Sequence, residues 1–453
     1  MPNTSEQTIT QFVETEFKDF SVENTRRMVP SIVDGLKRSQ RKAVWAMSQM
    51  KGLETVERVG LKAAAMTAYK HGGNNMCGTV INLAKDFPGT NNVPLIRKEG
   101  QFGSFIDHDN SSARYIEAEI HDNYRAFFKA EDDDILSHQY DQGKKIEPYY
   151  LYPIIPIVLV NGARAVGSGY GTKFPGHKVN DVLIAVLETL SMGRPQTKLV
   201  PGYNNYVGDV IRKDSEQIEI RGKLEIKNTT TVVITGIIPN YDQETFKTKQ
   251  LIPKLDAKEI VDYIDDSNET DGWNITIKYT REALSAHTEE SLLESFGLIN
   301  RDTPNYTLWD FEGKIKKYVC PEDIVVEFVE WRLARNEERR QAMLSKLQSE
   351  IDYWTQYLWF LKDYFDNTDK YKACNKQQML ERLLGLGIYD EHADKFIKTP
   401  AYKLNAEGIT KTEESINNLK AEYKALQEKT PKSIYLDDLE QLGQYIEEQN
   451  NVA

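Results

Sequence analysis

The chain has 453 residues, which is more than one compact core usually contains, so two to four domains are expected. Hydrophobic residues make up 40% and charged residues 28%, a composition typical of a soluble globular protein. The longest apolar run, near 154–160, is short and is broken up by Pro153 and Pro156, which excludes a membrane span. The amino-terminal sequence MPNTSEQTITQF has no basic start and no apolar stretch, which excludes a secretion signal.

The cysteines Cys77, Cys320 and Cys374 are far apart and form no C-x-x-C pair. This spacing argues against a zinc site or a disulfide framework and favours a reducing compartment. The sequence therefore predicts a cytoplasmic protein without a metal site of its own.

The net charge is −12, which by itself argues against a nucleic-acid partner, but the charge is unevenly distributed. Between Arg26 and Lys70 the sequence has ten basic residues against Asp34, Glu54 and Glu57, a local net charge of +7. A basic face on an acidic body suits a DNA clamp, because phosphates are bound by cations within a Debye length. Taken alone, such a patch is more often a solvated helix face, so this alternative stays open.

The first part of the chain is predicted to be mostly helical. Residues 1–21 are interpreted as a polar arm that could dock on a neighbour, and 22–86 as short helices joined by glycine turns. Apolar residues at helical spacing predict amphipathic helices near 40–47, 63–66 and 76–83. Short helices with tight turns are typical of a helix-turn-helix unit that binds DNA.

The middle of the chain is predicted to be a mixed α/β domain. Apolar and polar residues alternate there with many β-branched side chains, a pattern that predicts sheet strands. The predicted strands are 206–212, 217–226, 230–238, 273–279 and 306–311.

From Pro321 the chain is predicted to form a long helix, because two acidic residues follow this proline and neither proline nor glycine interrupts 321–365. At 1.5 Å per residue this helix is roughly 65 Å long. A second helix around 416–426 is predicted to run back along it, and the leucine-rich segment 379–388 to form a globule at the tip. The globule is predicted to offer an apolar contact surface to a second chain, formed by Leu380, Leu383, Leu384, Leu386 and Ile388. The predicted fold class is therefore α+β multidomain, with a helical head, an α/β middle and a long antiparallel coiled coil.

The strongest candidate for chemistry is the sequence around Tyr115. Gly100 and Gly103 allow backbone amides to approach a phosphate, and Arg114 places a guanidinium beside the phenol of Tyr115. A tyrosine hydroxyl has a pKa near 10, so it attacks a phosphate only where cations stabilise the phenolate and the developing charge. The structural alternative is strong, because the chain has 24 tyrosines and most Arg-Tyr pairs have no catalytic role.

Two further segments could contact DNA. His71, beside Gly72 and Gly73, could donate to a phosphate oxygen or act as a general acid, although a lone histidine is more often structural. Residues 152–172 combine a proline-rich apolar run with glycine turns. This segment could be a buried strand, or it could present Val166 as an apolar wedge between base steps.

These segments stand in the order and spacing of the breakage-reunion subunit of type IIA DNA topoisomerases, which the chain resembles over nearly its whole length. The matching motifs are Val33-Asp-Gly-Leu-Lys37 with Gln40-Arg-Lys42, His71-Gly72, Leu83–Phe87 with Asn91-Asn92, Gly100–Ser104, Ala113-Arg-Tyr115, Asn161–Thr172, Phe311–Tyr318 and Pro321–Ile324. A single match could arise by chance, but so many in one order are specific. The sequence departs from the family pattern at Arg38, Lys70, Gly73 and Val166.

The resemblance implies an arm (1–21), a winged-helix DNA-gate domain (22–150), a tower α/β domain (151–320) and a coiled coil with a dimerisation globule (321–453). Tyr115 would form a transient 5′-phosphotyrosyl bond with DNA, and Arg114 would stabilise the scissile phosphate. The residues implied to contact DNA are Lys37, Arg41, Lys42, His71, Gly100, Gln101, Ser104 and Val166.

The resemblance also implies a homodimer on double-stranded DNA, with ATP and Mg²⁺ both bound by a partner subunit. The sequence has no Gly-Lys-Ser/Thr phosphate loop and no Asp-x-Asp cluster in a suitable setting. Because no DNA-wrapping domain follows before Ala453, the T-even-type bacteriophage branch of the family is the most similar, and relaxation or decatenation is expected rather than supercoiling. The alternatives are a catalytically silent DNA-bending clamp, which would not need the Arg-Tyr pair, and a coiled-coil scaffold, which leaves the basic segment unexplained.

Overall fold

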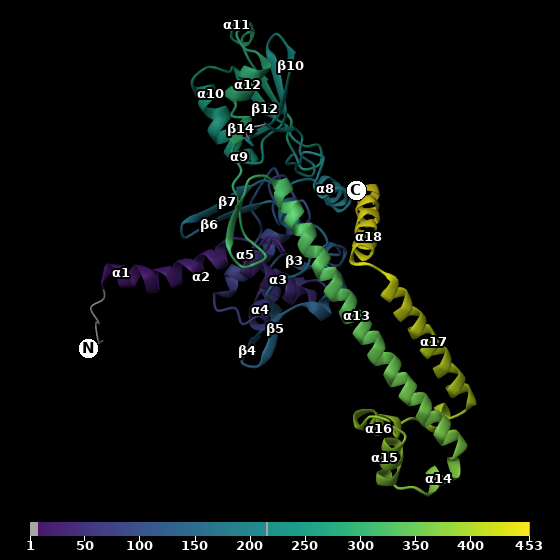
Figure 1. Cartoon of the computed structure of the whole chain (residues 1–453). Helices are drawn as coiled ribbons and strands as arrows, with labels where there is room; N and C mark the ends of the chain where they lie inside the picture. The colour runs from purple at the N-terminus through teal and green to yellow at the C-terminus, as the bar shows by residue number, and fades with distance from the viewer. Residues whose placement is uncertain (1–7, 214–215, 453) are drawn as a thin grey trace. The chain divides into compact units, whose positions relative to one another are not determined.

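The computed structural model describes residues 8–213 and 216–452 and contains both helices and sheets (Figure 1), so the mixed α/β class is confirmed. The chain divides into two compact units. One contains the residues up to Arg332 together with those from Asp438 onward, and the other contains Leu333–Asp437. Helices α13 (Pro321–Asp366) and α18 (Pro431–Val452) each contribute residues to both units.

The amino-terminal segment is a helix with an apolar surface. Helix α1 (Ile9–Phe12), the π-helical turn η1 (Val13–Phe17) and helix α2 (Lys18–Met28) follow one another directly. Residues 1–7 of the predicted arm lie outside the described residues. The description of the arm as polar is wrong for the part that is described, because it exposes large apolar side chains, those of Ile9, Phe12, Val13, Phe17 and Phe20.

Three helices form the core of the head, and they contain the amphipathic segments predicted there. They are α3 (Arg38–Ser48), α4 (Val56–Met66) and α5 (Gly73–Ala84). Helices α4 and α5 pack closely at Gly60, where a Cβ atom would lie 2.6 Å from the sulfur of Cys77. A small antiparallel sheet of order β1-β3-β2 completes the head, formed by β1 (Glu54–Thr55), β3 (Glu117–Ile120) and β2 (Ile96–Glu99).

Two hairpins project from the head. The first consists of β4 (His138–Asp141) and β5 (Lys144–Pro148), and the second of β6 (Ala163–Gly167) and β7 (Tyr170–Phe174). The apolar run before β6 is buried, and its last part forms helix α7 (Ile157–Asn161) rather than a strand. Helix α8 (Val179–Met192) follows the second hairpin.

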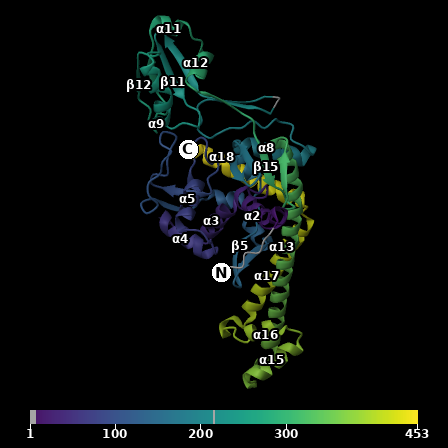
Figure 2. The same ribbon diagram turned by 90° about the vertical axis from the view of Figure 1, so that its left-hand side faces the viewer.

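Residues 206–302 form the central α/β region, in which strands β11 and β12 and helix α12 gather in one body (Figures 1 and 2). One sheet has the order β10-β11-β13-β12, with β10 (Lys223–Asn228), β11 (Thr231–Gly236), β13 (Ile275–Lys278) and β12 (Asp262–Asp265). A second sheet has the order β14-β9-β8, with β14 (Ile299–Asp302), β9 (Ile218–Arg221) and β8 (Asp209–Arg212). The helices of the region are α9 (Gln243–Phe246), α10 (Ile252–Asp256), α11 (Arg281–Ser285) and α12 (Glu289–Ser295). The predicted strand 217–226 is thus two strands, β9 and β10, in different sheets.

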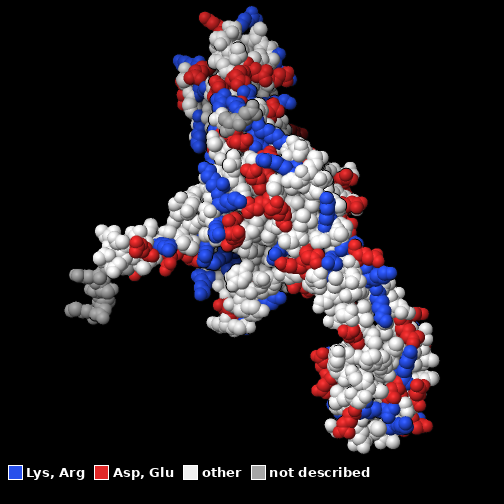
Figure 3. Space-filling model, in the orientation of Figure 1, with Lys and Arg blue, Asp and Glu red and all other residues white. Residues whose placement is uncertain are grey.

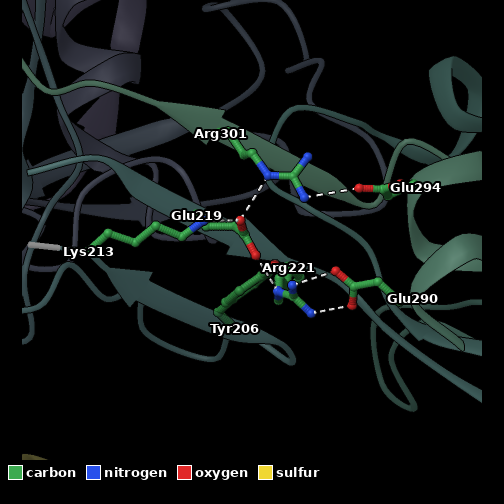
Figure 4. A network of polar contacts seen from close by, with 7 residues as sticks. All are labelled: Tyr206, Lys213, Glu219, Arg221, Glu290, Glu294 and Arg301. Carbon is green, nitrogen blue, oxygen red and sulfur yellow. Dashed lines mark hydrogen bonds and ion pairs between the residues drawn. The ribbon is translucent and has the colours of Figure 1, made fainter. Parts of the chain in front are cut away.

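An ionic network joins the second sheet to α12 (Figure 4). Its centre is Glu219, which is 2% exposed and accepts hydrogen bonds from three cationic side chains, those of Lys213, Arg221 and Arg301. The hydrogen bond from the Lys213 ammonium is the largest of several causes that lower the pKa of Glu219 to about 2. Arg221 and Arg301 also pair with Glu290 and Glu294 of α12, so the helix is fixed to the sheet.

The unit Leu333–Asp437 is an antiparallel helix pair with a small globule. Helix α17 (Ala406–Glu428) returns along α13, because Lys362 pairs with Glu413 while Arg340 reaches the carbonyl oxygen of Gln427. The globule contains α14 (Thr368–Ala373), α15 (Lys376–Gly385) and α16 (Asp390–Phe396).

The structure corrects the apolar contact surface that was predicted at the tip. Leu383 and Ile388 are buried in the globule's own core, with Phe360, Tyr371 and Phe396, so they are not available to a second chain. The exposed apolar side chains of the globule are those of Leu384, Leu386, Tyr389 and Tyr402.

Candidate nucleic-acid interface

The backbone around Tyr115 is fixed by the first turn of helix α4. The N–H of Val56 donates to the carbonyl oxygen of Ile116 (2.9 Å), and the N–H of Glu57 donates to that of Ala113 (3.0 Å). The first N–H groups of a helix have no partner within the helix, so these carbonyls satisfy them. The side chain of Ile116 is buried, whereas Tyr115 is 77% exposed. The phenol therefore projects into solvent from a backbone that is held on both sides.

Arg114 immediately precedes Tyr115 in the chain and has most of its hydrogen-bonding capacity available. Its guanidinium is 60% exposed, and one nitrogen lies 3.8 Å from a carboxylate oxygen of Glu57. An exposed ion pair of this length contributes little stability, typically about 0–1 kcal/mol. A phosphate that approached Tyr115 could therefore replace Glu57 as the partner of Arg114 at small cost.

The glycines of 100–104 shape the loop that leads to Tyr115. Gly100 and Gly103 have φ angles of +99° and +93°, a conformation that residues with a Cβ atom rarely adopt. At Gly103 a Cβ atom would also lie 2.8 Å from the carbonyl oxygen of His108. Gln101 is exposed, and its carbonyl oxygen accepts the N–H of Ser111 (2.9 Å). The hydroxyl oxygen of Ser104 accepts hydrogen bonds from two N–H groups of its own turn, so in this structure it stabilises the loop.

A groove of about 1110 Å³ in the head contains several of the predicted DNA contacts. Lys37, Lys42 and His71 line it, together with Arg27 and Lys70. His71 is exposed and stands edge-on to Tyr69, with ring centroids 5.2 Å apart. The ammonium of Lys37 donates to the carbonyl oxygen of Arg164 (3.0 Å), and partial burial lowers its pKa below the usual value. Tyr115 and Arg114 are not among the residues that line this groove in a single chain.

Two of the residues predicted to contact DNA have other partners. Arg41 is buried and forms two hydrogen bonds to Asp34, donates to the carbonyl oxygen of Leu36 (3.1 Å), and lies over the ring of Tyr150 (4.8 Å to the centroid). We therefore correct its assignment from DNA contact to structural support beneath the groove. The ammonium of Lys42 lines the groove but is paired with buried Glu147, so its charge is largely neutralised.

Val166 lies on a hairpin whose turn is fixed to a neighbouring helix. It is 75% exposed on strand β6, one residue before the turn. The turn is fixed to helix α2, because the N–H of Ser168 donates to the side chain of Asn24 (3.0 Å) and Gly167 lies against Thr25. An exposed apolar side chain on a rigid hairpin has the form that a wedge between base pairs requires.

The basic segment of the head is less positive than its sequence indicates. Several of its cations pair with carboxylates, and two of these partners, Glu23 and Glu147, lie outside the segment. On the face shown in Figure 3, Lys and Arg side chains alternate with Asp and Glu. Within the described part of the chain, Arg27, Lys37 and Lys70 line the groove without a carboxylate partner in the structure, so they supply its uncompensated charge.

Tyr140 is a groove residue that sequence reasoning missed. This exposed tyrosine lies near the tip of the β4–β5 hairpin, where Gln142 and Gly143 have φ angles of +47° and +77°. A two-residue turn with both φ angles positive is the common hairpin turn, and the glycine in Asp-Gln-Gly-Lys is the signal that could have revealed it.

The part of the chain that the structure describes contains neither a cluster suited to a metal ion nor a membrane-spanning helix. Among the described residues, no three or more His, Cys, Asp or Glu side chains are grouped so that they could hold a metal ion. None of the described helices is long and apolar enough to cross a membrane.

Comparisons with known proteins show that this chain is similar to type II DNA topoisomerases. The crystal structure of the DNA-binding, cleavage and re-ligation domain of Plasmodium falciparum topoisomerase II matches this fold with a TM-score of 0.90 and 28% identity, covering 98% of this chain and 65% of that one. DNA topoisomerase 2-alpha of Rattus norvegicus is 32% identical over 410 residues, and that of Gallus gallus is 30% identical over 418 residues. These alignments cover 88% and 90% of this chain but only 27% of each relative, so the chain spans about a quarter of their length.

The family follows from a sequence model that covers most of the chain. The family model for the A subunits of DNA gyrase and topoisomerase IV matches residues 27–440. The chain therefore belongs to this family, and its fold is that of a type II topoisomerase cleavage core.

Proposed function

We propose that this chain cleaves and reseals DNA as part of a type IIA DNA topoisomerase, with Tyr115 as the nucleophile. The observation that carries the proposal is an exposed phenol on a fixed backbone, preceded in the chain by an arginine whose guanidinium is largely available. The phenol oxygen would lose its proton and form a bond to the phosphorus, while the bond from phosphorus to the 3′ oxygen breaks and that oxygen takes up a proton. The 5′ end stays attached to Tyr115, and the reverse reaction reseals the strand.

Arg114 would supply the charge that this step needs. The free phenol has a pKa near 10, so the reaction depends on stabilising both the phenolate and the negative charge on the phosphoryl oxygens. A planar guanidinium can donate two hydrogen bonds to one phosphate. The single carboxylate that contacts Arg114, Glu57, does not make a magnesium site, because Mg²⁺ needs several oxygen ligands. We therefore keep the proposal that Mg²⁺ and ATP are bound by a partner subunit.

The groove would hold the phosphates of the DNA backbone. Lys37, Lys70 and Arg27 would neutralise phosphates, and His71 would donate a hydrogen bond. Val166 would enter between two base pairs and bend the duplex. Binding of this kind should weaken strongly as salt is raised.

A complete enzyme would require two copies of the chain, because one Tyr115 cuts one strand and a double-strand break needs two tyrosines related by a two-fold axis. The exposed apolar side chains of the globule would provide a contact between copies. With an ATPase partner, passage of a second duplex through the break would relax or decatenate DNA. A bacteriophage origin and a location in the host cytoplasm remain predictions from the sequence resemblance.

The test is to trap protein-linked DNA with denaturant after the chain has been incubated with plasmid, Mg²⁺ and a candidate ATPase subunit. Tyr115→Phe should abolish the covalent product while salt-dependent DNA affinity stays near that of the unmodified chain. Arg114→Ala should reduce the rate of cleavage by about 10²–10³-fold, as expected for the loss of one electrostatic stabiliser. Tyr149→Phe, at an exposed tyrosine that does not line the groove, is the matched control and should cleave normally.

Three outcomes would change the assignment. Protein-linked DNA from Tyr115→Phe would show that another tyrosine is the nucleophile. Joint loss of binding and cleavage in that variant would show that Tyr115 is structural. Firm DNA binding by the unmodified chain with no covalent product under any condition would favour the catalytically silent clamp.

A further inference from the structure

The loop before Tyr115 is anchored in the hydrophobic core of the central α/β region. Phe105 and Ile106 pack against that core, whose members come from residues 224–299. The ring of Phe105 stands edge-on to Trp273, with centroids 5.7 Å apart and planes inclined at 65°. Edge-to-face aromatic pairs of this kind add about 0.5–1.5 kcal/mol to ordinary apolar burial. The loop before Tyr115 therefore has an apolar anchor outside the head.

Polar contacts fix the same loop from two sides. The N–H of Gln243, at the start of α9, donates to the carbonyl oxygen of Ile106 (2.9 Å), and the carboxylate of Asp242 lies 3.9 Å from the ring of His108. On the other side, the ammonium of Lys85 donates to the carbonyl oxygen of His108 (2.8 Å). The ring of His108 stacks on Phe87, with centroids 5.2 Å apart.

The anchor is connected to Tyr115 by short contacts within the loop. Gly103 lies directly against the carbonyl oxygen of His108, and the carbonyl oxygen of Gln101 accepts the N–H of Ser111. The N–H of Tyr115 in turn donates to the carbonyl oxygen of Ser112 (2.9 Å). A displacement of the anchor would thus be carried through the closed loop to the residues around Tyr115.

A cavity beside the anchor leaves room for such a displacement. It measures about 270 Å³ and is lined by Phe105, His108, Tyr206, Tyr241 and Trp273, among others. Phe105 therefore packs against the core and also faces this cavity. Close packing on every side would resist movement, whereas a void removes the contacts that would oppose it.

We propose that Phe105 is a positioning residue for Tyr115. By docking the loop before Tyr115 into the central α/β region, it sets the position of the segment that carries this tyrosine. The role rests on the proposed function of Tyr115. Because Phe105 acts on the geometry of the segment and does not line the groove, it affects the chemical step and not DNA affinity. Displacement of a reacting group by about 1 Å can lower a rate by about 10²-fold.

The experiment compares Phe105→Ala, Phe105→Leu and Leu284→Ala in the full chain, each incubated with plasmid, Mg²⁺ and the candidate ATPase subunit. Leu284 belongs to the same core but lies on α11, away from the loop, so its truncation controls for general loss of stability. At saturating DNA, Phe105→Ala should lower the rate of covalent-complex formation by about 10-fold or more, with the DNA concentration for half-maximal rate unchanged. Phe105→Leu keeps an apolar anchor and should recover most of the rate, and Leu284→Ala should cleave at the normal rate.

Hydrogen exchange gives a second readout that does not depend on cleavage. Amides of residues 111–116 should exchange faster in Phe105→Ala than in Leu284→Ala. If these amides exchange at the same rate in the two variants, or if both variants slow cleavage to the same extent, the positioning role is refuted. If the unmodified chain yields no covalent complex while exchange still separates the two variants, the anchor stands and the proposed function fails. If Phe105→Ala does not fold, His108→Ala can replace it, because this variant removes the stack on Phe87 and leaves the core side chains unchanged. It should likewise slow cleavage and speed exchange of the amides of residues 111–116.

Discussion

Replacing Arg41 by alanine should destabilise the head rather than weaken DNA binding alone. Asp34 is fully buried, and its carboxylate accepts hydrogen bonds from Arg41 and from the N–H groups of Leu36 and Leu151 (both 3.1 Å). In the variant the carboxylate stays buried with two amide donors and no cation. Its desolvation is then only partly compensated, which is the costly situation for a buried charge.

The size of the effect can be estimated from these contacts. Removing one partner of a buried ion pair costs about 3–5 kcal/mol. Loss of the contact between the guanidinium and Tyr150 adds about 0.5–2 kcal/mol, and the two remaining amide donors offset a similar amount. We expect a net loss of about 3–5 kcal/mol. For the unit of about 350 residues that contains Arg41, this corresponds to a fall in the melting temperature of roughly 4–7 °C.

Thermal unfolding and salt-dependent DNA binding should be measured on Arg41→Ala and on Lys37→Ala as the matched control. Lys37 lines the same groove but has no carboxylate partner in the structure, so its removal should shift stability by less than about 0.5 kcal/mol. It should instead weaken DNA binding and reduce the slope of log affinity against log salt by about one. An unchanged melting temperature for Arg41→Ala with a reduced salt slope would refute the structural assignment.

Three further predictions concern stability and assembly. Glu219→Gln should cost about 3 kcal/mol, measured as faster hydrogen exchange in β8, β9 and β14, whereas Glu290→Gln, at a half-exposed partner in the same network, should have a much smaller effect. Because the folded pKa of Glu219 lies below its unfolded value, this stabilisation is complete above about pH 4.5 and is lost as the pH falls toward 2. Burial lowers the pKa of His177 to about 4, so the free energy of unfolding should fall by about 3 kcal/mol as the pH falls from about 6.5 to 4. Denaturant titrations at several pH values should show this decrease, and the variant His177→Gln should lack it. Charged substitutions of Leu384 and Leu386 should shift a dimer toward monomer in sedimentation experiments, and a chain already monomeric at micromolar concentration with DNA would contradict the proposed contact.

The helices and strands followed from the sequence because periodicity reports local geometry. Repeats of 3.6 residues predicted segments that lie in α3, α4 and α5, and alternation predicted several strands of the central α/β region, although it missed β12 and β14. The prediction also failed at 217–226, where Gly222 separates two strands that join different sheets. The alternating pattern continues across such a junction, so it cannot show that the chain changes sheets.

The partners of charged and apolar side chains did not follow from the sequence. Counting charges between Arg26 and Lys70 gave a strongly basic segment, but Lys42 pairs with Glu147, which lies 105 positions later in the chain. In the same way, the leucine-rich tip predicted an apolar surface without showing that Leu383 and Ile388 fill their own core. Periodicity shows which face of a helix is apolar, whereas the fold determines what covers that face.

The candidate site combines an exposed side chain with a restrained backbone, and these two properties seldom occur together. Exposed residues usually lie on mobile loops, because little apolar surface fixes them. Around Tyr115 the backbone is held by the first turn of α4, and the loop before it is held by the end of α5 and by the core of the central α/β region. Folding has therefore already ordered the segment, and little conformational entropy remains to be lost when a phosphate arrives. Such an arrangement suits the proposed role of Tyr115, which must hold the 5′ end of a strand at one position until the 3′ end returns.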